Sequence, residues 1–117
     1  LLASKFYMSE IQIKNLIKCG MHIGGHGLNH LRLSTLSYNE QKKEIISIIN
    51  FLKELGVETN DWVMCYPFGQ YNKTTIQILK KYKCGVGLTV NRKVADLKIN
   101  NIFTLPRFDT NDVYKKI

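Results

Sequence analysis

Apolar side chains recur every three or four positions in three stretches of the chain, which is the spacing of one face of a helix. Each stretch follows a residue that can cap a helix, namely Ser9, Ser37 and Asn72. Gly20 and Gly56 end the first two stretches. The sequence therefore predicts three helices, with apolar positions at Ile13, Leu16 and Ile17; at Ile45, Ile48, Ile49, Leu52 and Leu55; and at Ile76, Leu79 and Tyr82.

Short apolar runs lie between the predicted helices and have the length of strands. They span residues 21–23, 62–66, 86–90 and 102–105, and a last helix is predicted to begin at Thr110. Strands and helices that alternate in this way indicate an α/β fold, with a mainly parallel sheet and helices packed outside it. Functional sites of such folds gather at the carboxyl ends of the strands.

Two histidines four residues apart, His26 and His30, follow the first predicted strand in a glycine-rich segment. Neutral imidazole is a common zinc ligand, and an open catalytic site usually has about three protein ligands and a water. This segment supplies two ligands, and the alternative is a pair of histidines that only form hydrogen bonds. The third histidine, His22, alternates away from the segment within the predicted strand, so we assign it a structural role.

A second candidate segment follows the predicted strand at residues 62–66 and reads Y-P-F-G-Q-Y-N. Residues 21–37 resemble the metal-binding motif I-G-x-H-[ST]-x-x-H-x-x-L of polysaccharide deacetylases, the NodB-like domain of carbohydrate esterase family 4. Residues 65–72 are similar to the next motif of one branch, A-Y-P-[FY]-G-x-Y-N, and residues 105–109 resemble its L-P-R ending. The resemblance extends from about Met8 to Asp112.

The resemblance implies a partial irregular (β/α) barrel and a divalent metal ion, expected to be zinc, with His26 and His30 among its ligands. Members of the family begin with a strand that ends in an Asp-Asp pair, one carboxylate acting as base and the other as third ligand. Nothing in this chain matches that pair. We therefore expect residues 1–117 to be the carboxyl-terminal part of a single deacetylase domain whose opening strand or strands are missing. The alternative is a short natural homologue that has lost its base.

The resemblance also implies roles for residues 66–69. In the family the backbone amide of the tyrosine in this turn helps to bind the acetate oxygen, and Tyr66 occupies that position. Pro67 and Gly69 would fix the geometry of the turn, and Phe68 belongs to the same substrate-binding segment. The alternative is that aromatic side chains here, including Tyr71, fill the end of the barrel.

Two departures from the family concern charge and proton transfer. Cys65 stands where many members have an arginine that pairs with the catalytic base, and Arg107 in the L-P-R segment would compensate. The alternative is an ion pair of Arg107 with Asp109 or Asp112. No histidine follows His30, so the family's late histidine acid has no counterpart; Asp109 would either replace it or cap the final helix.

Composition narrows the class of partner. The chain has 117 residues, 44% of them hydrophobic, and no apolar run approaches the roughly 20 residues of a membrane span. The net charge is +8, but the lysines occur singly or in pairs and only three arginines are present, so we do not expect nucleic acid as partner. An acidic polysaccharide or cell-wall surface suits this charge. The three cysteines form no C-x-x-C pair, and we expect them to be small buried side chains rather than disulfide or zinc ligands.

The leading hypothesis is metal-dependent hydrolysis of N-acetyl groups on N-acetylglucosamine-type residues of a bacterial surface polysaccharide, in the cell envelope or outside the cell. Without the Asp-Asp pair, the chain alone is expected to be inactive. The first alternative is a carbohydrate-binding relic of the same fold without catalysis. A weaker alternative is a basic nucleic-acid-binding domain.

Overall fold

The computed structural model describes residues 3–112, and the three predicted helices are confirmed in it. They are α2 (Glu10–Lys18), α3 (Tyr38–Glu54) and α4 (Lys73–Lys81), which follow Ser9, Ser37 and Asn72. In each case the capping side chain accepts a hydrogen bond from the backbone amide three residues later, and the side chain of that later residue accepts one from the capping residue's own amide. The other helical elements are a short α-helix, α1 (Ala3–Phe6), and four 3-10 helices: η1 (Leu33–Thr35), η2 (Pro67–Gly69), η3 (Ile102–Thr104) and η4 (Thr110–Asp112).

The sheet has two strands in the described residues, β1 (Trp62–Cys65) and β2 (Cys84–Leu88), which pair in parallel. Single parallel bridges extend it on both sides: Gly25 pairs with Met64 of β1, and Leu105 pairs with Leu88 of β2. Four segments therefore run in the same direction. The alternation of helices with parallel strands confirms the predicted α/β class.

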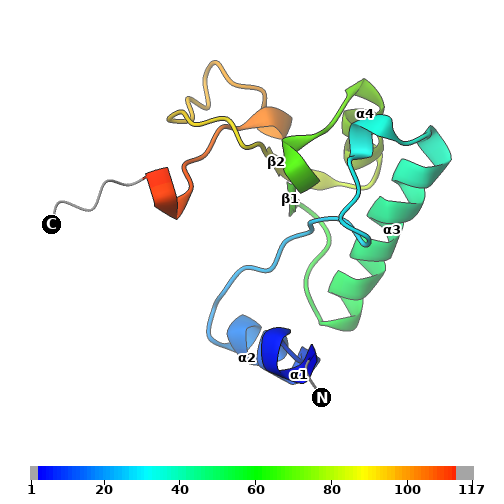
Figure 1. The fold of residues 1–117 in the computed structure, drawn as a ribbon, viewed down its shortest axis with the longest axis vertical. Helices are drawn as coiled ribbons and strands as arrows, with labels where there is room; N and C mark the ends of the chain where they lie inside the picture. The colour runs from blue at the N-terminus through cyan, green and yellow to red at the C-terminus, as the bar shows by residue number, and fades with distance from the viewer. Residues whose placement is uncertain (1–2, 113–117) are drawn as a thin grey trace, which may run out of the picture.

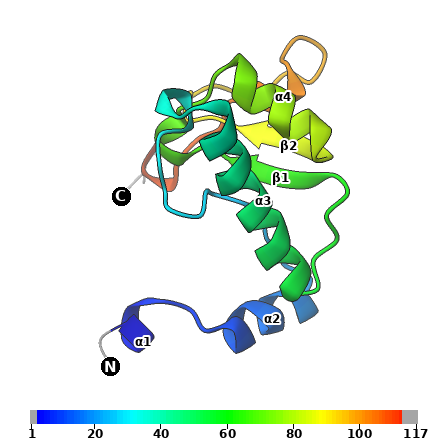
Figure 2. The same ribbon diagram turned by 90° about the vertical axis from the view of Figure 1, so that its right-hand side faces the viewer.

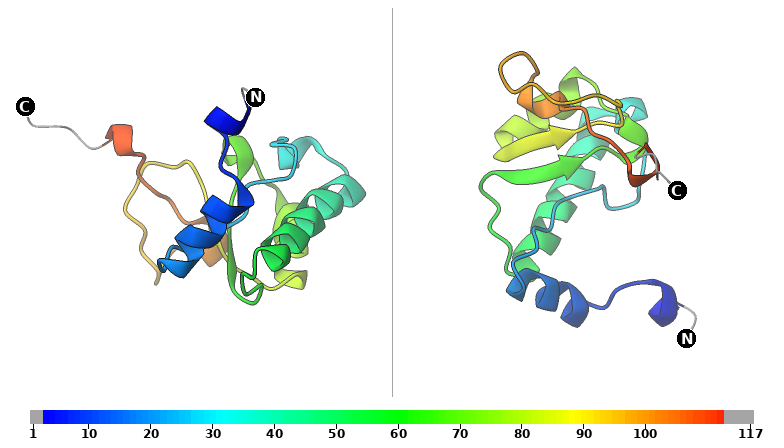
Figure 3. Two further views of the ribbon diagram at one scale, coloured as in Figure 1. Left: turned by 90° about the horizontal axis from the view of Figure 1, so that it is seen from below. Right: turned by 90° about the vertical axis from the view of Figure 1, so that its left-hand side faces the viewer.

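Helices α3 and α4 lie side by side and cover one face of the two strands (Figures 1 and 2). Figure 3 shows the strands from the opposite side, in front of α3. The apolar stripe of α3, together with Trp62 and Met64 of β1, provides half of the buried core residues. The indole nitrogen of Trp62 also donates a 2.9 Å hydrogen bond to the backbone carbonyl of Tyr82. The buried core comprises Leu33, Ile45, Ile48, Ile49, Leu52, Trp62, Met64, Tyr66, Ile78, Leu79, Cys84 and Phe103.

Helix α2 is not part of the core: none of its residues is buried. Figures 1 and 2 show α1 and α2 lying apart from the layer formed by the sheet, α3 and α4. The segment that follows was predicted to form a strand at residues 21–23, and this prediction is wrong: Met21 is exposed, and pairing begins only at Gly25. The reason is steric. A Cβ on Gly25 would lie 2.6 Å from Cγ2 of Ile48, so this is where the backbone can come close to the core.

The strand predicted at residues 102–105 is also wrong. Asn101 accepts a 2.9 Å hydrogen bond from the amide of Phe103, and this turn winds residues Ile102–Thr104 into η3, leaving only Leu105 to pair. The strand predicted at 86–90 exists but spans Cys84–Leu88, so both of its ends come two residues earlier than predicted. Thr110 does begin a helical turn, η4, which is of the 3-10 type.

The cysteines only partly match expectation. Cys84 is buried as predicted, whereas Cys65 is half-buried and Cys19 is exposed at the end of α2, so the prediction of burial is wrong for Cys19. All three are free thiols. None of the helices in residues 3–112 has both the length and the apolar character that crossing a membrane requires.

Candidate functional site

The position of His26 follows from the bridge between Gly25 and β1. The amide of Gly25 donates to Val63 and the amide of Cys65 donates to Gly25, so His26 leaves the sheet at its carboxyl edge. Its ring nitrogen Nδ1 lies 2.9 Å from the backbone carbonyl of Cys65. A carbonyl only accepts, so Nδ1 carries the hydrogen, and Nε2 of the neutral ring is left as an acceptor that faces Nε2 of His30. The contact selects the tautomer that a metal ligand requires.

A tight loop brings His30 back to His26. Gly27 and His30 have positive φ angles of 82° and 53°, a conformation that costs glycine little and is uncommon for other residues. The Nε2 atoms of the two imidazoles consequently lie 3.1 Å apart, with the ring centroids separated by 4.8 Å. Both rings are exposed. His26 also lines a hollow of about 330 Å³ between residues 23–28 and α3, whereas His30 is outside its lining.

The distance between the two nitrogens fits a shared divalent ion. Zinc binds imidazole nitrogen at about 2.0–2.1 Å, and two neighbouring ligands of a tetrahedral ion are then about 3–3.5 Å apart. The 3.1 Å separation of the Nε2 atoms lies within that range. It is also the length of a hydrogen bond, so it fits equally the alternative in which the two histidines only bond to each other. In residues 3–112 no cluster of three or more His, Cys, Asp or Glu side chains suits a metal, so the pair offers two ligand positions.

An aromatic residue covers His30 on one side. The ring of Phe68 lies 4.6 Å from the His30 ring, and the guanidinium of Arg32 lies 4.6 Å above the Phe68 ring. Phe68 has a φ of 55°, an uncommon value for a bulky residue, and its side chain remains 48% exposed. Its exposure does not fit the alternative that it fills the barrel end. Sequence reasoning missed Arg32, because this contact arises from the unusual backbone of Phe68 rather than from a regular spacing.

Tyr66 is held by its side chain as well as its backbone. It is buried, its hydroxyl donates 2.7 Å to the carbonyl of Phe103, and its ring stacks on Tyr71 at 4.6 Å. Burial raises the pKa of the Tyr66 hydroxyl far above its usual value, so the group stays neutral. The backbone amide predicted to bind acetate donates to the carbonyl of Leu88 at 3.3 Å, a length typical of a weak hydrogen bond.

Pro67 and Gly69 place this turn beside the histidine loop. Pro67 is buried, and a Cβ on Gly27 would lie 3.1 Å from its ring, so the turn and the loop are in close contact. Gly69 has a φ of 67°, and the amide of Gly69 donates 2.8 Å to the carbonyl of Tyr66. The structure thus brings residues 66–69 and the histidine pair together.

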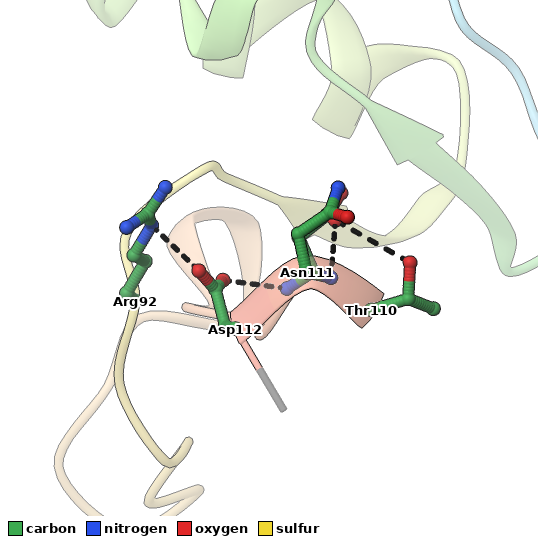
Figure 4. Close-up of polar contacts among 5 residues, drawn as sticks. Arg92, Thr110, Asn111 and Asp112 are labelled. Carbon is green, nitrogen blue, oxygen red and sulfur yellow. Dashed lines mark hydrogen bonds and ion pairs between the residues drawn. The ribbon is translucent and has the colours of Figure 1, made fainter. Parts of the chain in front are cut away.

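Arg107 lies in a different place. Its Nε donates 2.9 Å to the carbonyl of Thr89, just beyond β2, and it borders a hollow of about 320 Å³. The pairing with Asp112 considered from the sequence is not present, because Asp112 pairs with Arg92 at 3.0 Å (Figure 4). Neither the histidines nor Tyr66 belong to this hollow, whose lining is Val90, Arg92, Arg107, Asp109, Asn111 and Asp112.

Asp109 serves the local turn. Its carboxylate accepts hydrogen bonds from the backbone amide of Asn111 at 2.9 Å and from the Asn111 side chain at 2.8 Å. These bonds, the backbone one foremost, hold the pKa of Asp109 below its usual value. This is the capping role that the sequence left open beside that of a general acid.

Glu44 was not identified from the sequence. It lies on α3, 4% exposed, and accepts hydrogen bonds from the backbone amides of Leu28 and Asn29, both at 2.9 Å, and from the Asn29 side chain at 2.6 Å. The available signal was its position beside Ile45 on the apolar face of a predicted helix, where a carboxylate needs partners.

Comparisons with known proteins agree with the motifs. The family model for polysaccharide deacetylase matches residues 2–86, a range that contains both histidines and the turn at 66–69 but not Arg107. YxkH of Bacillus subtilis (strain 168), assigned by its name to the polysaccharide deacetylases, is 25% identical over 88 residues, which are 75% of this chain and 31% of that protein. The structure of the Streptococcus pyogenes deacetylase PplD in complex with acetate is similar with a TM-score of 0.79 and 31% identity, over 86% of this chain and 43% of that one. The chain therefore spans less than half the length of either protein.

Proposed function

We propose a function that starts from the family, since this chain belongs to the polysaccharide deacetylases. In this proposal it forms part of a metal-dependent enzyme that removes N-acetyl groups from a bacterial surface polysaccharide. The substrate residues in this proposal are of the N-acetylglucosamine type, and the place of action is the cell envelope or the space outside it. The observation that carries the proposal is the pair of Nε2 atoms of His26 and His30, 3.1 Å apart.

In this proposal His26 and His30 hold a zinc ion. A bound divalent ion would supply Lewis acidity toward the acetamide group. The contribution of this chain is orientation: the Cys65 carbonyl holds the His26 ring, and the loop geometry holds His30 beside it. Such fixed ligands need no rearrangement when an ion arrives.

The turn at residues 66–69 would hold the substrate. The amide hydrogen of Tyr66 is shared only weakly with Leu88, so an acetate oxygen would accept it at little cost. The exposed face of Phe68 beside His30 offers an apolar surface to a sugar ring or an acetyl methyl group.

The proposal includes the wider architecture. The parallel segments from Gly25 to Leu105 would be neighbouring strands of an irregular (β/α) barrel, and the 117 residues would be one part of a single deacetylase domain. The coverage of 43% of the PplD structure supports this reading.

Zinc binding tests the metal site directly. The chain would be titrated with Zn²⁺ while the imidazole proton resonances are followed by NMR. We expect His26 and His30 to shift together, and His26→Ala and His30→Ala each to abolish the response. His22→Ala is the matched control, because His22 is also exposed but lies outside the loop. An equal response in all three variants would exclude the site.

Acetate release tests the reaction. The protein expressed from its whole reading frame would be incubated with N-acetylglucosamine oligomers and with cell-wall polysaccharide, with and without a chelator. We expect release that the chelator abolishes. Tight binding of the polysaccharide without any release would instead support the carbohydrate-binding relic.

A further inference from the structure

We propose that Glu44 is the positioning residue of the histidine pair: its carboxylate binds the loop between His26 and His30 to α3 and thereby sets the distance between the two imidazoles. This inference rests on the proposed metal site for its functional meaning. The contacts on which it is built belong to Leu28 and Asn29, the residues that separate His30 from the start of the loop at Gly27.

One carboxylate makes three hydrogen bonds to this short loop. Oε2 accepts from two consecutive backbone amides, those of Leu28 and Asn29, both at 2.9 Å. Oε1 accepts from Nδ2 of Asn29 at 2.6 Å. Consecutive amides that point at one anion form a concave binding arrangement, and bonds to an ionised acceptor are stronger than those between neutral groups.

The burial of Glu44 makes these bonds structurally important. Its side chain is 4% exposed and lies on the helix that forms the core, so it has a fixed position. The loop itself is exposed at Leu28, Asn29 and His30 and contributes no residue to the core. The carboxylate is therefore a buried polar connection between α3 and an exposed loop.

The loop is confined from a second side as well. A Cβ on Gly27 would lie 3.1 Å from the Pro67 ring and 3.6 Å from Oε2 of Glu44, so both groups are in close contact with the loop at this point. Pro67 and the carboxylate therefore both lie close to the backbone at the start of the segment that leads to His30. Loss of the carboxylate releases one side and leaves both imidazoles chemically intact.

A ligand pair held in place binds an ion without first being ordered, and variants of residues that orient metal ligands typically lose about 10–100-fold in affinity. We therefore expect Glu44→Ala to weaken Zn²⁺ binding by about that factor. Glu44→Gln should remain close to the wild type. The amide oxygen of the glutamine takes the place of Oε2. If the Asn29 amide group rotates by 180°, its oxygen accepts a hydrogen bond from the glutamine nitrogen.

The experiment has one arm without metal and one with it. In the metal-free chain, amide hydrogen exchange would be measured at Leu28 and Asn29, together with NMR contacts between the rings of His26 and His30. In the second arm, Zn²⁺ affinity would be measured by competition with a chromophoric chelator. Glu54→Ala is the matched control, because it removes an exposed carboxylate from the same helix.

Glu44→Ala should accelerate exchange at both amides, separate the rings and weaken Zn²⁺ binding, while Glu54→Ala changes none of these. A folded Glu44→Ala chain that keeps its protected amides, its ring contact and its Zn²⁺ affinity would overturn the inference. Should Glu44→Ala fail to fold, Asn29→Ala, which removes only the Oε1 bond at an exposed position, must weaken Zn²⁺ binding or the inference is wrong.

The two arms separate this inference from the proposed function. If wild type and His26→Ala bind Zn²⁺ equally, the metal site is wrong. The exchange rates and ring contacts of Glu44→Ala then still decide whether the carboxylate fixes the histidine pair.

Discussion

The hydroxyl of Tyr66 donates a 2.7 Å hydrogen bond to the backbone carbonyl of Phe103, across the space left by a glycine. A Cβ on Gly87 would collide with both of these groups, so a glycine at this position makes the bond possible. The bond connects the turn after β1 to η3. It also means that the side chain of Tyr66 serves the fold, and that any chemical role of this residue belongs to its backbone amide.

Tyr66→Phe should therefore destabilise the protein without affecting the histidine pair. The substitution leaves the buried carbonyl of Phe103 without its donor, which typically costs about 1–3 kcal/mol. Urea unfolding would measure the loss, and Zn²⁺ titration should be unchanged. Tyr38→Phe, at a tyrosine that is 45% exposed on α3, is the control and should leave stability as it is. Equal stability of Tyr66→Phe and the wild type would contradict the prediction.

Cys84 should make the fold sensitive to alkali. Burial raises the pKa of its thiol from 9.0 to about 11, so the folded chain holds this proton more tightly than the unfolded chain does. The resulting stability is fully present below pH 9 and is lost as the pH rises toward 11, by on the order of 2 kcal/mol. Urea unfolding at pH 8 and pH 11 should show a smaller difference for Cys84→Ala than for the wild type. Cys19→Ala, which changes an exposed thiol, is the control and should lose as much stability between pH 8 and pH 11 as the wild type does. If Cys84→Ala also loses as much as the wild type, the assignment to Cys84 is wrong.

The helices were predictable from sequence because their signals are local. Ser9, Ser37 and Asn72 form their capping bonds within four residues of chain, so the pattern contains the whole interaction. The strand at residues 62–66 was predictable for a related reason, since a central strand needs apolar residues on both faces. The motifs at residues 21–37 and 65–72 are also contiguous stretches of sequence, and both lie within the range that the family model matches; the L-P-R segment at 105–109 lies outside it.

The predictions that failed depend on contacts between distant residues. Residues 21–23 do not pair, and the chain first meets the sheet at Gly25, where its backbone lies against Ile48 and Trp62, far away in sequence. Glu44 was missed because its partners, Leu28 and Asn29, are backbone amides at the far end of a loop and have no signature in the sequence. The approach of His26 and His30 was expected from their spacing, whereas the positive φ angles at Gly27 and His30 that accompany it have no signature in the sequence.

Gly25 offers a test of this steric argument. A Cβ there would lie 2.6 Å from Ile48 and 2.9 Å from the Trp62 ring, so Gly25→Ala should overpack the core at a cost of about 1–3 kcal/mol. Gly56→Ala is the comparison: its φ of 80° is unfavourable for alanine, but nothing lies within 4 Å of the added carbon. Thermal unfolding should rank Gly25→Ala as the less stable variant. The opposite order would mean that backbone strain, rather than crowding, governs these positions.

Arg107 stays a predicted partner of the catalytic carboxylate that the family resemblance implies, and it borders a different hollow from the one that His26 lines. Its Nε is held by the Thr89 carbonyl beyond the carboxyl end of β2, and it forms no salt bridge within residues 3–112. If the proposed reaction is right, acetate release by the protein expressed from its whole reading frame should fall in the order wild type, Arg107→Lys, Arg107→Ala, since lysine keeps the charge but loses the planar fork. A base that loses its supporting charge forfeits part of a contribution of about 10²–10⁴-fold, so we expect Arg107→Ala to be at least about tenfold slower. Arg92→Ala, in the same hollow but paired with Asp112, is the control and should remain active. Full activity of a folded Arg107→Ala variant would reduce the role of Arg107 to its hydrogen bond with Thr89.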